Sequence, residues 1–129
     1  WRNLGRPEAG LSGVQFVAGD YGGHQGPYVV QGAAEAPWAF AGTGLANGSR
    51  FGNGGIEIDA RSAASPPGTR VLASIPNLMG PGRTAEMTYY ETPAGAKVFA
   101  AGALNFGASI GDPAVARLVQ NVWNRLSSP

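Results

Sequence analysis

"AEMTYYETPAGAKVFAAGALNF", residues 85–106, predicts a β-hairpin that continues into a buried segment. Met87–Glu91 and Lys97–Ala101 are rich in strand-forming residues, and "TPAG" between them supplies the proline and glycine of a tight turn. The nearly continuous apolar run "VFAAGAL" (98–104) is typical of an inner strand that is covered on both faces. Because such strands are more usual in α/β folds, this run favours an α/β class.

A helix is predicted directly after the hairpin, in "DPAVARLVQNVWNRL" (112–126). Asp112 suits the N-cap position and Pro113 the first helical position, while Arg125 near the end complements the helix dipole. Apolar residues at three- and four-residue spacings form one face; they are Val115, Leu118, Val119, Val122, Trp123 and Leu126. We therefore expect a C-terminal helix that packs on a sheet.

The rest of the chain is rich in strands and glycine-containing loops. We expect strands at 12–19 (buried), 28–31, 56–59 and 70–75, turns or loops at 20–28, 65–69 and 76–84, and a long ordered loop with short strand pieces at 34–55. Several strands followed by one helix indicate a sheet covered on at least one face. Without the helix, a β-sandwich is an equal alternative.

The composition indicates one domain or domain fragment, residues 1–129. Hydrophobic residues make up 43% of the chain, and the net charge is +1 with no basic cluster, so we expect neither nucleic-acid nor membrane binding. The absence of cysteine excludes thiol catalysis and thiolate metal sites but does not decide the compartment. Removal of an initiator methionine would not normally expose Trp1, so we expect a piece of a longer polypeptide.

Two carboxylates in "GGIEIDARS" (54–62) are the first candidates for chemistry. In an extended segment Glu57 and Asp59 point to the same face, and Ile56 and Ile58 to the opposite one. The pair is either the solvated side of an ordinary strand, next to Arg61, or an acid–base pair near the aromatic loop upstream. The sequence leaves both interpretations open.

Two further residues are weaker candidates. His24 in "DYGGHQG" is the only histidine, so it could supply one general base or one metal ligand but not a site that needs two imidazoles. Asn105 follows the apolar strand and precedes a glycine, a position where α/β folds gather ligands. Tyr89 and Tyr90 alternate across their strand and cannot both bind one ion, so we expect them to pack on the sheet.

Four stretches together resemble the C-terminal region of the N,N-dimethylformamidase large-subunit family. In order along the chain they are "WRNLGRPEAGLSGVQF" (1–16), "GGIEIDARSAASPPGTRVLAS" (54–74), "AEMTYYETPAGAKVFAAGALNFG" (85–107) and "DPAVARLVQNVWNRL" (112–126). The resemblance implies a bacterial protein, with the cytoplasm favoured. It also implies the C-terminal part of an α/β domain similar to class I glutamine amidotransferases, which are flavodoxin-like.

The resemblance further implies a hydrolase that acts on a small amide. The family enzyme cleaves a formamide at an iron held by two tyrosines and a glutamate, and we expect these ligands upstream of the region resembled here. We therefore expect no cofactor within this chain, iron in the full-length protein, and as partner a larger N-terminal portion of the same polypeptide or a separate subunit. Glu57 becomes the best candidate for a carboxylate near that site, ahead of Asn105 and His24.

Two alternatives come from other functional classes. The chain could be a non-catalytic β-rich module that binds a carbohydrate or another ligand by stacking on Trp38 and Phe40. It could instead be a structural subunit or a cleaved half whose apolar strand edges need a partner chain.

Overall fold

The structure, a computed structural model, describes residues 2–21 and 23–128, with Arg2 described in its backbone only. Its elements are η1 (Arg2–Leu4), α1 (Ala9–Ser12), β1 (Gln15–Gly19), β2 (Gln25–Val30), α2 (Pro37–Phe40), β3 (Arg50–Gly55), β4 (Glu57–Ala60), β5 (Arg70–Ile75), β6 (Ala85–Glu91), β7 (Lys97–Ala100), η2 (Phe106–Ser109) and α3 (Pro113–Ser127). None of the helices in the described residues is both long and apolar enough to cross a bilayer.

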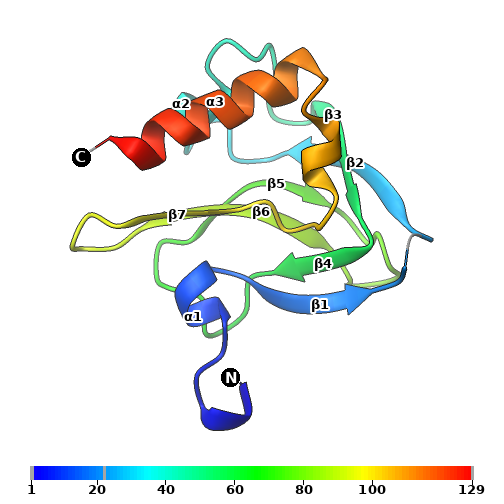
Figure 1. Cartoon of the computed structure of the whole chain (residues 1–129), viewed down its shortest axis with the longest axis vertical. Coiled ribbons are helices and arrows are strands. Elements are labelled where there is room, and N and C mark those ends of the chain that lie inside the picture. Colours follow the sequence, from blue (N-terminus) through cyan, green and yellow to red (C-terminus); the bar gives the residue numbers. More distant parts are fainter. Residues whose placement is uncertain (1, 22, 129) are drawn as a thin grey trace.

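Two antiparallel sheets make up the strand layer. Five strands pair in the order β3-β2-β5-β6-β7 and form a half-barrel, while β1 and β4 pair as a separate two-stranded sheet. Figure 1 shows α3 on one side of the β6–β7 hairpin and the β1–β4 pair on the other. The molecule is therefore a small mixed α/β domain that a C-terminal helix closes on one side.

The parallel sheet implied by a flavodoxin-like domain is absent from the described residues, so that part of the predicted fold class is wrong for this chain. Every pair of strands is antiparallel. Parallel neighbours need a crossover of a dozen or more residues, usually a helix, whereas β6 and β7 are joined by five residues, 92–96. The predicted mixed α/β class with a closing helix is confirmed.

The apolar run at 98–104 was predicted as an inner strand, and this too is wrong. β7 is the edge strand of the five-stranded sheet, and its four residues are all half-buried. Both α3 and α1 contact it. Helices therefore cover β7, while the residues that follow it, up to Leu104, run beside β4, where Ala103 bridges Ile58.

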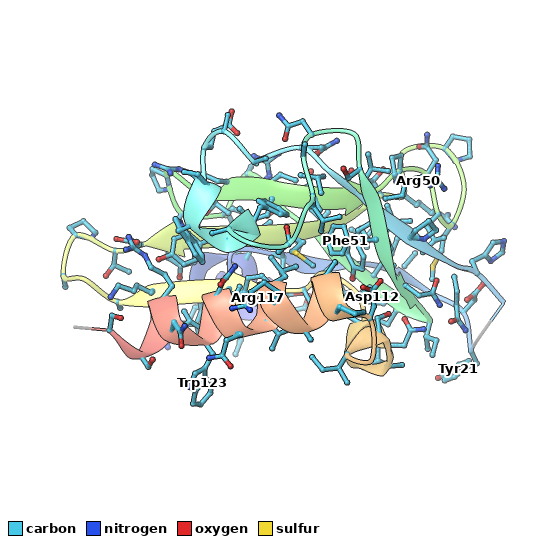
Figure 2. The ribbon with its side chains drawn as sticks, turned by 90° about the horizontal axis from the view of Figure 1, so that it is seen from above. Tyr21, Arg50, Phe51, Asp112, Arg117 and Trp123 are labelled. Atoms are coloured by element: carbon cyan, nitrogen blue, oxygen red, sulfur yellow. The ribbon has the colours of Figure 1, made fainter. Side chains whose placement is uncertain are left out.

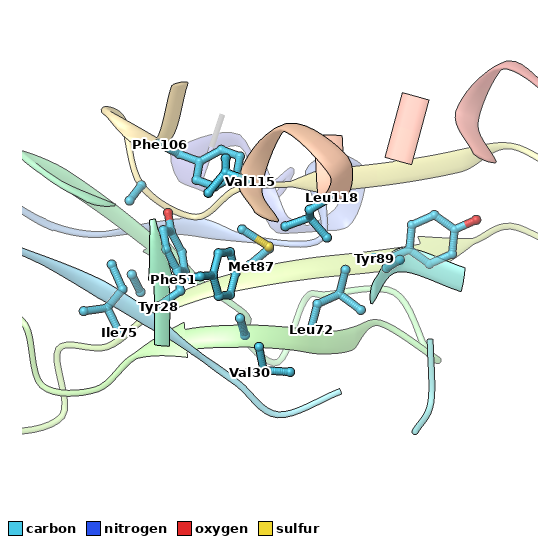
Figure 3. Close-up of a cluster of buried hydrophobic side chains, with 14 of the residues drawn as sticks. Tyr28, Val30, Phe51, Leu72, Ile75, Met87, Tyr89, Phe106, Val115 and Leu118 are labelled. Carbon is cyan, nitrogen blue, oxygen red and sulfur yellow. The ribbon is translucent and has the colours of Figure 1, made fainter. Parts of the chain in front are cut away.

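The core lies between the five-stranded sheet and α3 (Figure 3). Tyr28 is central: its ring stacks on Phe51 with centroids 5.6 Å apart and meets Phe106 edge-on at 5.5 Å, and its hydroxyl donates to the Ala101 carbonyl at 3.0 Å. Leu118 reaches this core from α3 and is fully buried. Burying aromatic and aliphatic side chains of this size contributes about 1.5–3 kcal/mol each, which makes this layer the main source of stability.

The C-terminal helix begins where it was predicted. The Asp112 side chain accepts from the Ala114 amide at 2.8 Å, the N-cap interaction that stabilises a helix start. Val115, Leu118 and Val122 are buried, but Trp123 is 68% exposed and points away from the ribbon (Figure 2). The predicted apolar face is therefore only partly covered within the described residues.

A polar cluster fastens the end of α3 to the hairpin. Arg125 donates to the Tyr89 hydroxyl at 3.2 Å and pairs with Glu91 at 2.5 Å, while Tyr89 itself donates to Glu91 at 2.5 Å. The Trp38 ring of α2 packs on Tyr89 with centroids 4.8 Å apart, and Arg125 lies over Trp38 at 5.6 Å. These contacts fix the C-terminal end of α3 on β6 and α2.

The predicted strands are found with shifted bounds. The strand at 70–75 is confirmed as β5. The stretch 12–19 was predicted as a buried strand, but α1 runs to Ser12 and β1 is half-exposed, because a two-stranded sheet leaves much of its surface open. The loop predicted at 20–28 ends at His24, because β2 begins at Gln25 and not at residue 28 as predicted. The long loop at 34–55 contains α2 and β3.

Candidate functional site

Glu57 opens β4 and lies opposite Gly19 of β1. Glu57 lines two hollows in the surface, with volumes of about 500 Å³ and about 300 Å³. Phe16 and Leu104 also line both hollows. Glu57 is exposed, and its carboxylate makes no hydrogen bond or ion pair with the described residues. A carboxylate in this setting is free to accept a hydrogen bond or a proton from a small molecule.

The alternation predicted for this stretch is only partly observed. Glu57 and Asp59 line the same larger hollow, and Ile58 between them is fully buried, as the two-residue period of a strand requires. Ile56 does not share the face of Ile58: it precedes β4, has a positive φ of 68° and borders the smaller hollow together with Glu57. The left-handed backbone at Ile56 breaks the alternation one residue before the carboxylate.

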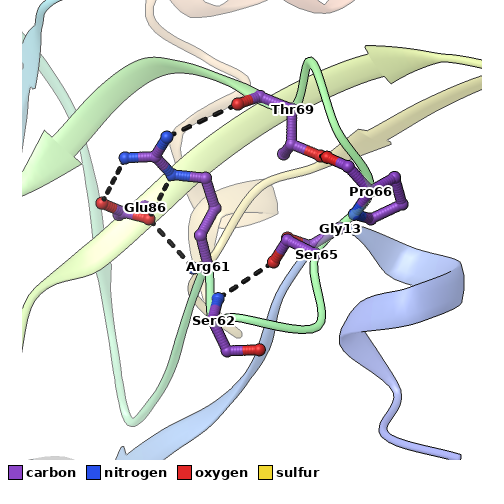
Figure 4. Close-up of polar contacts among 7 residues, drawn as sticks. All are labelled: Gly13, Arg61, Ser62, Ser65, Pro66, Thr69 and Glu86. Carbon is purple, nitrogen blue, oxygen red and sulfur yellow. Dashed lines mark hydrogen bonds and ion pairs between the residues drawn. The ribbon is translucent and has the colours of Figure 1, made fainter.

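Arg61, which the sequence placed beside the two carboxylates, pairs with Glu86 of β6 instead. Its backbone amide and its Nε both donate to Glu86, at 2.9 and 3.0 Å, and its guanidinium also reaches the Thr69 carbonyl at 3.4 Å (Figure 4). Next to it, Ser65 accepts from the Ser62 amide at 2.9 Å (Figure 4). These contacts fix the far end of β4 on the five-stranded sheet.

Asn105 lies near Glu57, just before η2. Its Nδ2 donates to Gln25 Oε1 at 2.7 Å, and Asn53 donates to the same oxygen at 2.8 Å. The Oδ1 of Asn105 is buried without a hydrogen-bond partner among the described residues. Asn105 therefore ties the segment after β7 to the start of β2.

His24 is an exposed residue, with 62% of its side chain accessible, and it pairs through Nδ1 with the Asp20 carboxylate. The hydrogen bond from His24 lowers the pKa of Asp20 below its usual value. The His24 carbonyl accepts from the Ile56 amide at 3.4 Å, and Asp20 borders the smaller hollow. His24 thus lies at the rim of the site rather than inside it.

The structure brings the three predicted site residues into one neighbourhood through their backbones. The Leu104 amide donates to the Glu57 carbonyl at 3.0 Å, which sets Asn105 next to β4, and Ile56 links Glu57 to His24. Among the described residues, the three side chains make no hydrogen bond with one another. Sequence reasoning did not single out Gln25 or Leu104, because each meets the site only through residues far away in the chain.

The aromatic residues of the loop upstream are engaged elsewhere. Phe40 is part of the core, and Trp38 contacts Tyr89 and Arg125. The stacking surface needed by the carbohydrate-binding alternative is therefore already occupied by the chain itself, and the strands of the described residues form a half-barrel and a two-stranded sheet rather than a β-sandwich.

The described residues offer no set of donors that fits an iron, whose ligands the resemblance places upstream of this chain. In residues 2–21 and 23–128 no three His, Cys, Asp or Glu side chains are placed to hold a metal ion. Tyr89 is bonded to Glu91 and Arg125, and Tyr90 donates to the Leu11 carbonyl at 2.5 Å. Both tyrosine hydroxyls are therefore engaged within the domain.

Comparisons with known proteins provide the remaining evidence. A family model described as "N,N-dimethylformamidase beta subunit-like, C-terminal" matches residues 1–120. A comparison with curated proteins gave no match.

Proposed function

Because the chain belongs to the N,N-dimethylformamidase beta subunit-like family as its C-terminal domain, we propose that it forms part of an amidohydrolase that cleaves a small amide C–N bond. The observation that carries the proposal is Glu57, which borders both hollows with an unengaged carboxylate. In this proposal the preceding part of the subunit supplies the metal centre, as the resemblance to the family implies.

In this proposal Glu57 works as an acid–base or water-orienting carboxylate. Amide hydrolysis requires a water molecule to lose a proton and the leaving nitrogen to gain one, and a positioned carboxylate can accept the first proton and deliver the second. Asp59 lines the same larger hollow, so the site has a second carboxylate close to the first. Phe16 and Leu104 add apolar surface that suits the alkyl groups of a small amide.

Asn105 and His24 have secondary roles in this proposal. Asn105 ties the segment after β7 to the start of β2 through its bond to Gln25, and His24 pairs with Asp20, which borders the smaller hollow. Neither side chain contacts the Glu57 carboxylate. Their substitution should therefore affect hydrolysis less than substitution of Glu57.

The test is the Glu57→Gln variant of the protein that carries this domain together with the preceding part of the subunit. Glutamine keeps the shape of the side chain but cannot exchange a proton, so hydrolysis of N,N-dimethylformamide should fall by about 100-fold or more. Glu35→Gln, at an exposed residue that borders neither hollow, is the matched control and should keep full activity. Equal activity of the two variants would refute the role of Glu57.

A second candidate function, association, is favoured by an apolar groove beside α3. The groove has a volume of about 390 Å³ and is lined by Phe99, Phe106, Gly107, Ile110, Val119, Val122, Trp123 and Leu126. Half or more of the surface of Ile110 and Trp123 is exposed. Exposed apolar side chains gathered in one place mark an interaction surface.

We propose that the preceding part of the same subunit occupies this groove. The family model describes the C-terminal domain of a beta subunit, and this description favours the rest of the same subunit as the partner of an apolar surface. The groove is formed by η2, β7 and α3 and does not include Glu57, so the domain can dock there and leave both carboxylate hollows open. The association and catalytic roles are thus compatible.

A further inference from the structure

Ile56 has a backbone conformation that its side chain disfavours. Its φ is 68°, and among the described residues the only other non-glycine residue with a positive φ is Asn77. Asparagine enters the left-handed region readily, whereas a β-branched side chain there crowds the backbone. A strained residue of this kind persists only where its surroundings hold it in place.

Ile56 stands where the chain leaves the five-stranded sheet at the end of β3 and enters the two-stranded sheet at β4. Its carbonyl accepts from the Asp20 amide at 2.8 Å, and its amide donates to the His24 carbonyl at 3.4 Å. The next residue is Glu57, whose carbonyl is held by the Leu104 amide at 3.0 Å. The backbone conformation of Ile56 therefore sets the direction in which the chain enters β4 at Glu57.

The two residues before Ile56 are glycines for a reason of space. A Cβ on Gly54 would lie 2.7 Å from the Tyr28 hydroxyl, and one on Gly55 would lie 2.2 Å from the His24 carbonyl oxygen. Close packing thus requires two consecutive residues of high backbone freedom immediately before the candidate carboxylate. A β-branched residue after them has a narrow range of rotamers and backbone angles, so it limits that freedom.

We propose that Ile56 is a positioning residue for Glu57: its strained and stiff backbone fixes the β3–β4 junction and aims the carboxylate at the two hollows. This inference rests on the proposed function for its effect on hydrolysis, but its structural part can be measured separately. Glycine at position 56 would remove the strain and create three consecutive glycines. The fold would lose little, while Glu57 would lose its fixed direction.

The experiment compares Ile56→Gly, Ile56→Val and Asn77→Gly in this chain and in the protein that carries it. We expect Ile56→Gly to unfold at the same or a higher denaturant concentration than the parent. The amides of Asp20 and Leu104 should exchange with solvent at least tenfold faster, and hydrolysis should fall at least tenfold through kcat. Ile56→Val keeps the β-branched side chain, so its amide exchange should stay slow and its activity should stay close to that of the parent. Asn77→Gly should change neither the exchange rates nor the activity.

Two results would overturn the inference. Parent-like exchange at Leu104 and parent-like hydrolysis in Ile56→Gly would show that the junction does not need a stiff residue. A large loss of stability in both Ile56→Gly and Ile56→Val would show that Ile56 acts through side-chain packing. If Glu57→Gln is fully active, the proposed function fails, but the exchange rates of Asp20 and Leu104 still decide whether Ile56 holds the junction.

Discussion

The β6–β7 hairpin lies between α3 and the β1–β4 pair (Figure 1), and side chains on its two sides differ in how far they are buried. On the α3 side, Leu118, Met87 and Tyr28 are fully buried, and the helix is fastened by a polar cluster. On the β1–β4 side, Leu104 is 67% exposed and Phe16 is 42% exposed, around an unengaged carboxylate. The first side therefore provides the stability of the fold, and the second provides surface that can meet another molecule.

Charged residues show the same contrast. Glu91 and Glu86 each pair with an arginine and join elements of the fold. Glu57 pairs with no described residue and borders two hollows instead. A carboxylate that the fold does not use for its own stability is available for chemistry, and this difference distinguishes Glu57 from the structural glutamates.

The largest expected effect is that of a leucine-to-alanine substitution on the α3 side, compared with the same substitution on the β1–β4 side. Leu118→Ala removes a fully buried side chain and should lower the free energy of unfolding by about 3 kcal/mol, through lost burial and the cavity left behind. Leu104→Ala removes a mostly exposed side chain and should change it by no more than about 0.5 kcal/mol. Urea unfolding followed by circular dichroism measures both, and equal losses would remove the distinction between the two sides.

A smaller effect is expected for Trp123→Ser, and it should depend on context. In this chain alone the side chain is mostly exposed, so stability should change by less than about 0.5 kcal/mol. With the preceding part of the subunit attached, Trp123 in the lining of the docking groove should contribute about 2 kcal/mol. Gln120→Ser, on the same helix but outside the groove, is the control. A loss that is the same in both proteins would contradict docking at α3.

The smallest expected effect is the pH dependence at Glu91. The hydrogen bond from Tyr89, together with Arg125, lowers the pKa of Glu91 below its ordinary value of 4.5. The ionised form therefore stabilises the folded state at pH values above 4.5, and this contribution is lost as the pH falls through the lowered value.

Glu91→Gln should thus be less stable than the parent at pH 7, by a smaller margin at pH 3 than at pH 7, and with a difference well below that of Leu118→Ala. Urea midpoints at the two pH values measure this. A difference that grows toward acid pH would show that Glu91 does not hold α3 in its ionised form.

The elements that could be predicted from the sequence carry their signals locally. The hairpin around "TPAG" and the helix that starts at Asp112 are specified by turn and capping residues within a few positions of one another. The strand at 70–75 is bounded by turn residues and was predicted in full. The pairing of β1 with β4 could not be predicted, because it joins residues about 40 positions apart and depends on tertiary packing.

The candidate site likewise has features that could be predicted from the sequence and features that could not. The placement of Glu57 and Asp59 on one hollow follows from the two-residue period of a strand and could be predicted. The bond between Asn105 and Gln25 joins residues 80 positions apart, so no local pattern indicates it. The apolar run 98–104 misled the prediction because covering helices and flanking strands select the same side chains.

The most direct test compares Glu57→Gln with Glu86→Gln, measuring unfolding and N,N-dimethylformamide hydrolysis on the same samples of the protein that carries this domain. We predict that Glu57→Gln unfolds within about 0.5 kcal/mol of the parent but loses about 100-fold or more of its activity. Glu86→Gln should lose stability because it weakens the Arg61 pair that anchors β4, while each folded molecule keeps its activity. A Glu57→Gln protein that loses stability and keeps its activity would contradict the assignment of Glu57 to catalysis.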